Sequence, residues 1–381
     1  MSDLSPIPFA KAYMAGDELA YVTQSFSSAA VVGDGPFTAR ATELITKLTG
    51  GTGSLLTTSC THALEMTALL LDLAAGDEVI MPSFTFVSTA NAYALRGAVP
   101  VFVDIRPDTL NLDESQLEAA ITERTKAVVV VHYGGVAAAM DEILAIAGRH
   151  GLTVIEDNAH GLGGSYQGRP LGSLGLMATQ SFHGTKNVHC GEGGALVVND
   201  ADLLARAEII REKGTNRSQF FRGQVDKYRW VDIGSSYLPA DPLAAFLTAQ
   251  LERFEEIQAP RLTIWQRYDD ELSAWAASNG VGVPVVPAEC VHPAHVYHLV
   301  MPSHEHQAGL IAHLRERNIT APFHYVPLHS SPAGERYGRV GPEGCPVTDR
   351  VSESLVRLPL FSPLTGEEQT RVIDGVLSYQ F

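Results

Sequence analysis

Residues 152–160 read Leu-Thr-Val-Ile-Glu-Asp-Asn-Ala-His. The run 152–157 predicts a buried strand, and the carboxylate of Asp157 stands at the point where that strand ends. Similar short apolar runs follow one another along the chain, interleaved with helical patterns at 63–73 and 139–150. Strands that are apolar throughout and alternate with helices form a parallel sheet covered on both faces, so the sequence predicts an α/β fold with a mostly parallel sheet sandwiched by helices. The other predicted strands lie at 78–82, 99–104, 127–133, 179–183 and 194–199.

The character of the chain changes after the last of these strands. Residues 242–275 predict long amphipathic helices, 295–301 a strand and 305–317 a further helix. A chain of 381 residues that is 45% hydrophobic is long enough for one large and one smaller core. We therefore expect a large domain over 1–250 and a smaller C-terminal α/β domain over 251–381.

The composition is that of a compact acidic protein. Its formal net charge of -16 repels phosphate backbones, so nucleic acid is not expected as a partner. No apolar run reaches the ~18 residues of a membrane span, and the first residues lack a signal-peptide pattern. We expect no membrane association and a cytoplasmic location. The cysteines are far apart and form no CxxC pair, which argues against a disulfide framework and a zinc site.

Polar residues recur where the predicted strands end. Ligands of open α/β sheets bind beyond the carboxyl ends of the strands, so we expect Ser83 and Thr85, Asp157 and His160, and the run 181–186 to converge. Asp157 either caps the next segment or pairs with a heterocyclic nitrogen, whose protonated form a carboxylate favours. A protonated pyridine ring is a better electron sink, which pyridoxal phosphate (PLP) chemistry needs.

Lys186 lies in Ser-Phe-His-Gly-Thr-Lys-Asn, just after a predicted strand, and a glycine-rich stretch follows at 191–195. Most lysines are solvated surface charges, but this one has small, aromatic or glycine neighbours. A lysine in an apolar setting loses its proton more easily and can form a Schiff base with an aldehyde cofactor.

Two weaker patterns accompany these residues. Residues 57–63 place hydroxyl side chains before a helix, which suits either a cofactor phosphate or an ordinary N-cap, and Ser181 could add a hydroxyl donor. Phe84 or Phe86 could stack on a flat ring, although aromatic residues near strand ends usually belong to the core. GxSxG, GxxxxGK[ST] and HExxH motifs are absent. Five histidines alternate with apolar residues, which argues against a metal site: His295, His298, His304, His306 and His313.

In this order the motifs resemble the DegT/DnrJ/EryC1/StrS aminotransferase family of PLP fold type I. The resemblance runs over nearly the whole chain and includes Gly-Asp-Gly-Pro-Phe at 33–37, the hydroxyl loop and the segments around Asp157 and Lys186. Residues 213–237 are similar to the subgroup that forms dTDP-4-amino-4,6-dideoxygalactose. The resemblance implies transfer of an amino group from L-glutamate to dTDP-4-keto-6-deoxyglucose, with a homodimer whose sites lie at the interface.

The resemblance also implies roles for individual residues. Lys186 would bind PLP covalently and move protons, Asp157 would pair with the ring nitrogen, and His160 would contact the phenolic oxygen. Cofactor binding is further expected from Cys60, Thr61, Phe86, Ser181 and Ser236. Substrate binding is expected from Lys213, Arg222, Tyr325 and His329.

The chain departs from the family pattern twice. Cys60 replaces the glycine of the usual Ser-Gly-Thr loop, so backbone freedom is lost there. Residues 234–237 replace a Gly-x-Asn-x-Arg segment that reaches the partner subunit's phosphate, and Ser236 is the expected substitute.

Several alternatives stay open. Another nucleotide carrier (GDP or UDP), amination at C3 of the sugar, and either stereochemistry at C4 fit the same motifs. A sugar dehydratase of this family carries histidine in place of Lys186, which argues against that reaction. A cysteine desulfurase acting through Cys345 and a PLP-binding regulator without catalysis are the remaining alternatives.

Overall fold

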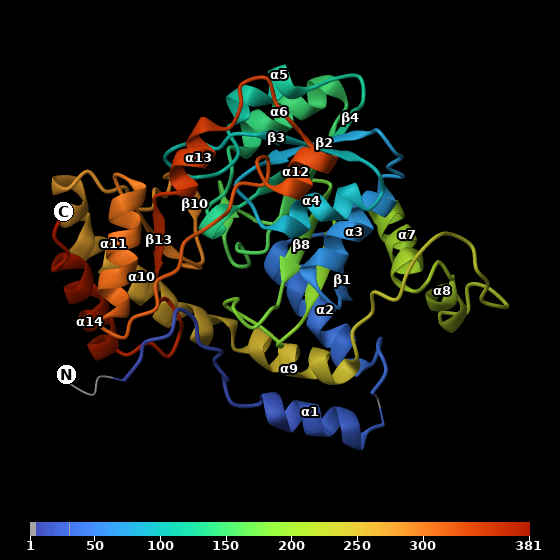
Figure 1. Cartoon of the computed structure of the whole chain (residues 1–381). Helices are drawn as coiled ribbons and strands as arrows, with labels where there is room; N and C mark the ends of the chain where they lie inside the picture. Colours follow the sequence, from blue (N-terminus) through green and yellow to red (C-terminus); the bar gives the residue numbers. More distant parts are fainter. Residues whose placement is uncertain (1–4, 30) are drawn as a thin grey trace.

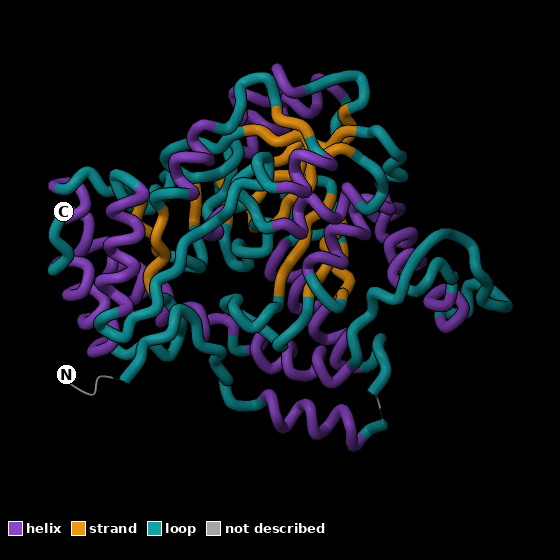
Figure 2. Tube along the Cα trace, viewed as in Figure 1, coloured by secondary structure: helices purple, strands orange, loops and turns teal. Residues whose placement is uncertain are grey.

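The computed structural model describes residues 5–29 and 31–381, and its main feature is an eight-stranded sheet (Figure 1). The strand order is β1-β9-β8-β5-β4-β2-β3-β12. Helices lie on both sides of this sheet (Figure 2). The strands are β1 (Gly53–Thr57), β2 (Glu78–Pro82), β3 (Val99–Val103), β4 (Thr125–Val131), β5 (Thr153–Asp157), β8 (Met177–Ser181), β9 (Gly194–Val198) and β12 (Arg339–Val340).

The six strands from β8 to β12 in this order pair in parallel, as the sequence predicts. Strand β9 is the exception that leaves the sheet mostly parallel, because it pairs antiparallel with both β8 and β1. A parallel return needs a crossover, usually a helix, and the connection from β8 to β9 consists of turns. Strand β1, which the sequence analysis did not predict, consequently ends at the same edge as β8: Thr57 and Ser181 both face Gly194.

Alternate side chains of the strands pack on opposite faces of the sheet. Val79 and Met81 join the core under α3 (Cys60–Leu70), α4 (Val87–Ala94) and α7 (Ala201–Arg211). Ile80 joins the core under α5 (Leu117–Ala120) and α6 (Met140–His150), while β1, β8 and β9 pack on the same side against α2 (Pro36–Thr49) and α9 (Asp241–Glu252). Both faces are therefore buried, which explains why the strands are apolar throughout.

The C-terminal part builds a separate core. Strands β11 (Tyr297–Val300) and β13 (Leu355–Leu358) pair antiparallel and pack with α10 (Phe254–Ser278), α11 (His304–Arg315) and α14 (Gly366–Leu377). Ile7 joins this core, while β12 returns to the large sheet beside β3. The division at 250 stays a prediction, and these two segments run across it.

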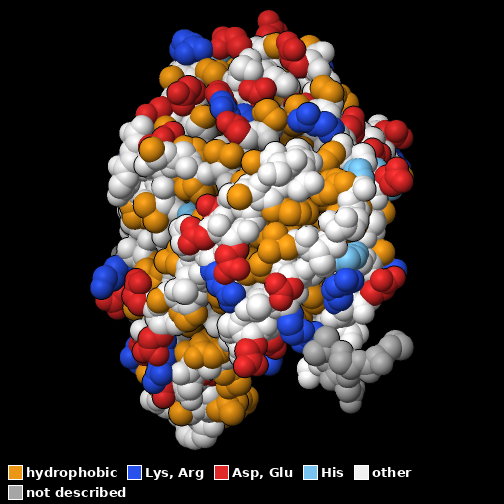
Figure 3. Space-filling model, turned by 90° about the vertical axis from the view of Figure 1, so that its left-hand side faces the viewer, with side chains coloured by type: hydrophobic (Ala, Val, Ile, Leu, Met, Phe, Trp, Pro, Cys, Tyr) orange, Lys and Arg blue, Asp and Glu red, His pale blue; other side chains and the backbone are white. Residues whose placement is uncertain are grey.

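The remaining elements are short or peripheral. On the side that carries both chain termini, acidic and basic side chains are interspersed with apolar ones (Figure 3). Among the described residues, none of the helices combines the length and the apolar character needed to cross a membrane. The remaining elements are α1 (Glu18–Ser27), α8 (Arg217–Phe221), α12 (Pro332–Tyr337), α13 (Pro346–Ser352) and the small sheet of β6 (Ser165–Tyr166), β7 (Arg169–Pro170) and β10 (Cys290–Val291).

A buried carboxylate attaches the returning C-terminal segment to the sheet. Glu78, at the start of β2, accepts hydrogen bonds from Arg339 at 2.6 and 3.0 Å, from Arg124 at 2.7 Å and from Thr122 at 2.7 Å. Burial by itself would raise the pKa of Glu78, but these hydrogen bonds outweigh it and lower the pKa to about 2.

Replacing Glu78 with glutamine is expected to lower the free energy of unfolding by about 3 kcal/mol, because it leaves two arginines without their buried partner. Denaturant unfolding followed by fluorescence measures the change, and Glu343→Gln, at an exposed position, is the matched control. In the wild type, the contribution of ionised Glu78 to the free energy of unfolding should be complete above pH 4.5, the ordinary pKa of a glutamate. It should be lost as the pH falls toward 2, the lowered pKa of Glu78. Equal stability of the two variants would contradict this role.

Candidate active site

A cavity of about 380 Å³ opens at the edge of the sheet where the parallel strands end. Val131, Asp157 and Ser181, the last residues of β4, β5 and β8, all line it. Thr85, His160 and Lys186 line it as well, so these predicted residues do converge. Ser83 does not, because it lies behind the wall and contacts His329.

The start of α3 forms one wall of the cavity. The Ser59 hydroxyl caps the helix by accepting from the His62 amide at 3.1 Å, which starts the helix at Cys60 rather than at the predicted residue 63. Ser59, Cys60 and Thr61 line the cavity, and Thr61 shares a 2.7 Å hydrogen bond with Ser88, a cavity residue that the sequence analysis missed. The first N–H groups and the dipole of a helix suit an anion, so this wall fits a cofactor phosphate.

The cysteine that replaces the family's glycine costs nothing here. Cys60 is the first residue of α3 and is not among the residues with positive φ. Its thiol donates to Thr179 at 3.5 Å, and burial raises its pKa to about 12, so it stays protonated. The glycine that this wall does require is Gly194, because a Cβ there would collide with the backbone of Ser59 and Cys60. The expected cofactor contact of Cys60 is consistent with its backbone N–H alone.

Asp157 is buried with its two oxygens fixed. Thr89, on α4, donates to Oδ2 at 2.7 Å, and the amide of Ala159 lies 3.3 Å from Oδ1. Burial raises the pKa of Asp157, whereas these hydrogen bonds and the charge of Lys186 act in the opposite direction. A buried carboxylate of this kind accepts a positively charged partner, such as a protonated ring nitrogen. Thr89 carries no sequence signal, because only the packing of α4 against the sheet brings it to β5.

The two candidate stacking residues have different positions. Phe84 is 1% exposed and packs against Tyr133 and Tyr325 with ring centroids 5.2 and 5.3 Å apart, so it is a core residue. Phe86 is 58% exposed, caps α4 and lines the cavity. Of the two, only Phe86 can contact a bound ring.

Lys186 lies in the turn-rich connection between β8 and β9. Its amide donates to the carbonyl of His183 at 2.8 Å, and its side chain lines the cavity. Burial lowers the pKa of the Lys186 amine to about 8; the nearby Cys60 and Asp157 oppose this shift, and Arg357 adds to it. The amine therefore loses its proton more readily near neutral pH than an ordinary lysine does.

The lowered pKa can be measured on the cofactor-free protein. Acylation of Lys186 by a small amine-reactive reagent is expected to be half-maximal near pH 8, because the ammonium form below that pH does not react. Peptide mass spectrometry at a series of pH values gives the midpoint, with the exposed Lys126 as a reference for reagent decay. A midpoint at the ordinary value of 10.5 would show that burial does not act on this amine.

Stacked histidines form a further wall. The rings of His160 and His295 stack with centroids 4.2 Å apart, and His324 stacks on Tyr325 at 3.6 Å. Burial lowers the pKa of His160 and His295 well below the ordinary value, and the charge of Lys186 adds to this, so both rings are neutral. The described residues contain no group of three or more His, Cys, Asp or Glu side chains arranged to hold a metal ion.

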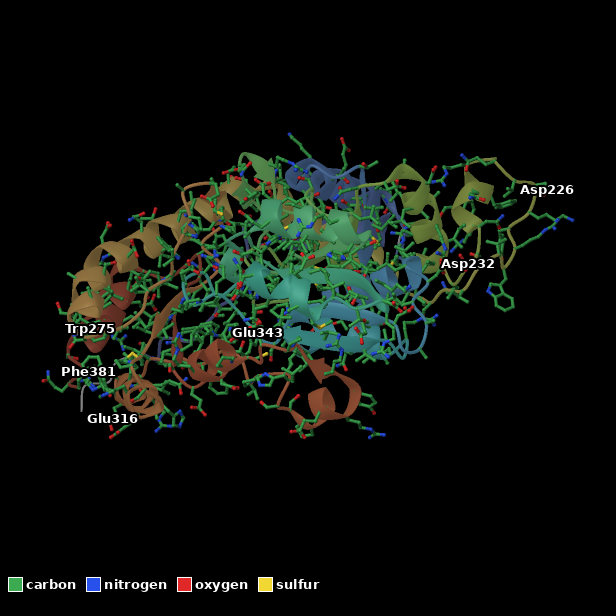
Figure 4. The ribbon with its side chains drawn as sticks, turned by 90° about the horizontal axis from the view of Figure 1, so that it is seen from above. Asp226, Asp232, Trp275, Glu316, Glu343 and Phe381 are labelled. Carbon is green, nitrogen blue, oxygen red and sulfur yellow. The ribbon has the colours of Figure 1, made fainter. Side chains whose placement is uncertain are left out.

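Other predicted residues lie away from this chain's own cavity. Arg222 pairs with Glu208 at 2.6 Å, Lys213 pairs with Glu212 at 2.9 Å, and Ser236 is exposed. All three belong to the segment 213–237, which projects from the body around α8 (Figure 1). Figure 4 shows Asp226 and Asp232 in this segment, at the end of the molecule opposite to Trp275 and Phe381.

Tyr325 and His329, the two substrate-binding residues predicted in the C-terminal part, lie in different places relative to the cavity. Tyr325 lines the cavity. His329 does not, because Ser83 holds its Nδ1 at 2.7 Å and Asp349 lies 3.4 Å from its Nε2. Phe9 and Arg357, which the sequence analysis missed, line the cavity instead.

These walls together fit PLP. The start of α3 offers donors to a phosphate, Phe86 and Ala159 offer faces to a ring, Asp157 offers a charge to the ring nitrogen, and Lys186 offers an amine to the aldehyde.

Comparisons with known proteins agree with this geometry. The family model described as "DegT/DnrJ/EryC1/StrS aminotransferase family" matches residues 12–377. Aminotransferase TlmJ from Streptoalloteichus hindustanus is 30% identical, with a TM-score of 0.89 and 98% of each chain covered. A DegT DnrJ EryC1 StrS aminotransferase from Brucella abortus is 31% identical, with a TM-score of 0.86 and 94% of each chain covered. The PLP form of Spr1654 from Streptococcus pneumoniae is 25% identical, with a TM-score of 0.89, covering 98% of this chain and 99% of the other.

The family resemblance and the fold class inferred from the sequence are thus confirmed over nearly the whole chain. The chain belongs to the DegT/DnrJ/EryC1/StrS aminotransferase family, whose members are PLP-dependent enzymes.

Proposed function

We propose that this protein transfers the amino group of L-glutamate to C4 of dTDP-4-keto-6-deoxy-D-glucose. The products would be 2-oxoglutarate and a dTDP-4-amino-4,6-dideoxyhexose. The observation that carries the reaction class is the convergence of Lys186, Asp157 and the start of α3 on one cavity. The choice of sugar rests on the similarity of residues 213–237 to one subgroup of the family.

When bound, PLP supplies the electron sink that lets a proton leave the α-carbon of the donor. Lys186 has the roles of base and acid: its Nζ accepts the α-proton of glutamate and later delivers a proton to C4 of the sugar. Asp157 lies buried in the cavity wall, where a positively charged ring nitrogen would favour its ionised form. The neutral ring of His160 can donate or accept a hydrogen bond without adding charge.

The atoms balance over two half-reactions. The donor gives up its amino group and its α-hydrogen, and a water oxygen becomes the carbonyl oxygen of 2-oxoglutarate. The keto oxygen of the sugar leaves as water, and C4 gains the amino group and one hydrogen.

We further propose a cytoplasmic homodimer in which the segment 213–237 reaches the cavity of the partner. This segment exposes Phe221, Tyr228 and Trp230, the last of which is 80% exposed, on a protein whose other large aromatic side chains are mostly covered. Aromatic side chains are enriched in protein interfaces. Arg222, Lys213 and Ser236 would then act on the substrate or cofactor of the other subunit.

The test is a mass assay of the purified protein with PLP, L-glutamate and dTDP-4-keto-6-deoxyglucose. An amino-sugar product supports the proposal, and NMR of that product gives the stereochemistry at C4. If glutamate is converted but this sugar is not aminated, the same assay with GDP-linked, UDP-linked and 3-keto sugars identifies the acceptor. If PLP binds and neither half-reaction occurs, the protein is a regulator and the proposal is wrong.

A further inference from the structure

Arg357 reaches the cavity from the C-terminal core. It lies on β13, and its side chain lines the same cavity as Lys186. Its guanidinium carbon is 4.3 Å from the ring centroid of Phe9, and Nη2 donates to the carbonyl of Phe323 at 3.0 Å. The face of the guanidinium group and one of its amino groups are thus occupied, and the group is fixed in position.

The charge of Arg357 lacks a counter-ion. Within residues 5–29 and 31–381, no carboxylate forms an ion pair with it, and its Nε is buried without a hydrogen-bond partner. Other arginines in these ranges do form ion pairs, for example Arg222 with Glu208, and the buried Arg261 donates to two backbone carbonyls instead. Burial lowers the pKa of Arg357. A partly buried cation with an unsatisfied donor is costly unless a ligand completes it.

A ligand that balances the charge of Arg357 and accepts its free hydrogen bonds must be an anion that enters this cavity. The wall that would take the cofactor phosphate is the start of α3, whereas Arg357 belongs to β13 and contacts Phe9 and Phe323. Arg357 and Lys186 line the same cavity, and the charge of Arg357 contributes to the lowered pKa of Lys186, so a ligand of Arg357 shares the cavity with the reacting amine. A guanidinium group matches the two oxygens of a carboxylate, because both are planar and two N–H groups can point the same way.

We propose that Arg357 binds a carboxylate of the amino donor and thereby selects an acidic amino acid. This inference rests on the proposed transamination, since that reaction brings a carboxylate to Lys186. Arg357 would hold the donor with its α-carbon within reach of the Lys186 amine.

The experiment uses the PLP-loaded full-length protein with Arg357→Gln, Arg357→Lys and the control Arg350→Gln. Arg350 is exposed on α13 and lies outside the cavity. Calorimetry measures the Kd of glutarate, a dicarboxylate that cannot react, and the PLP absorbance measures the KM of L-glutamate in the donor half-reaction. The glutamine variant is expected to raise both constants about tenfold to a hundredfold. The lysine variant should recover part of the loss, because it keeps the charge and loses the planar fork.

The outcomes separate the inference from the proposed function. The Kd of PLP and the KM of the sugar nucleotide should match those of the control. An unchanged glutarate Kd in both Arg357 variants overturns the inference, as does a loss confined to the sugar nucleotide. If Arg357→Gln does not fold, Arg357→Lys decides. A wild-type protein that binds glutarate through Arg357 but never converts glutamate supports the inference while refuting the proposed reaction.

Discussion

Replacing Lys186 with alanine is expected to reduce the rate of amino-group transfer by at least about 10⁴-fold, because the variant loses both the covalent link to the cofactor and the proton carrier. No other amine lines the cavity within the described residues, so no neighbour can take over. The expected signature is a protein that still binds PLP, through the start of α3 and Asp157, but releases it on dialysis. Borohydride treatment should then no longer fix the cofactor to the protein.

Lys126→Ala is the matched control, since Lys126 lies near the opposite end of its strand, in β4, and pairs only loosely with Asp77 at 4.0 Å. Its rate and its borohydride labelling should equal those of the wild type. Full activity of Lys186→Ala would refute the assignment of this residue and, with it, the proposed mechanism. Loss of the fold as well as activity is not expected, because Lys186 forms no ion pair with any of residues 5–29 and 31–381.

Replacing Asp157 with asparagine is expected to lower the rate of the donor half-reaction by a hundred to several thousandfold. The side chain keeps its shape and loses its charge, and removing one member of a buried charge pair costs about 3–5 kcal/mol. In the wild type, Thr89 and the amide of Ala159 each donate a hydrogen bond to one oxygen of the carboxylate. The asparagine side chain has a single oxygen, so it can accept only one of these two hydrogen bonds. Stopped-flow absorbance of the loaded enzyme measures this half-reaction directly.

Asp270→Asn, on the exposed side of α10, is the control for the charge change. A second readout separates a chemical effect from a structural one: the affinity for PLP should fall in Asp157→Asn and not in the control, while the thermal midpoints of both stay close to the wild type. If Asp157→Asn reacted at the wild-type rate, the carboxylate would merely cap the segment that follows β5, which is the alternative that the sequence left open.

The predicted strands and helices agree with the structure where the hydrophobic pattern is long and continuous. Six strands of the sheet and the helices predicted at 242–275 and 305–317 lie within a few residues of the predicted ranges. The pattern did not indicate which strand runs antiparallel, because it reports burial on two faces and not the sense of pairing. β1 and β12 were missed: β1 has only two large apolar residues, and β12 is a two-residue strand whose place depends on Glu78 and Arg339.

The site residues could be predicted from the sequence where a reactive side chain lies at or just after the end of a predicted strand. Asp157 and Ser181 lie near the ends of predicted strands, and His160 and Lys186 come just after them. Their convergence followed from the rule that parallel strands present their carboxyl ends at one edge. Phe84 and Phe86 could not be distinguished, because their side chains are equally aromatic and differ only in which way the chain turns before α4. Thr89 and Arg357 have no local signal, since each acts on a residue far away in the sequence.

The sequence by itself therefore determined the α/β class, the two apolar faces of the sheet, and the residues whose chemistry fits PLP. Those properties are local, because they follow from hydrophobic period and from residue type at a strand end. Only the tertiary structure decided which aromatic faces the cavity, which hydroxyl fixes Asp157, and which arginine shares the cavity with Lys186 while lacking a counter-ion among the described residues. Those properties depend on distances between segments that are remote along the chain. Such distances are set only by the packing of the large sheet and of the C-terminal core around the cavity.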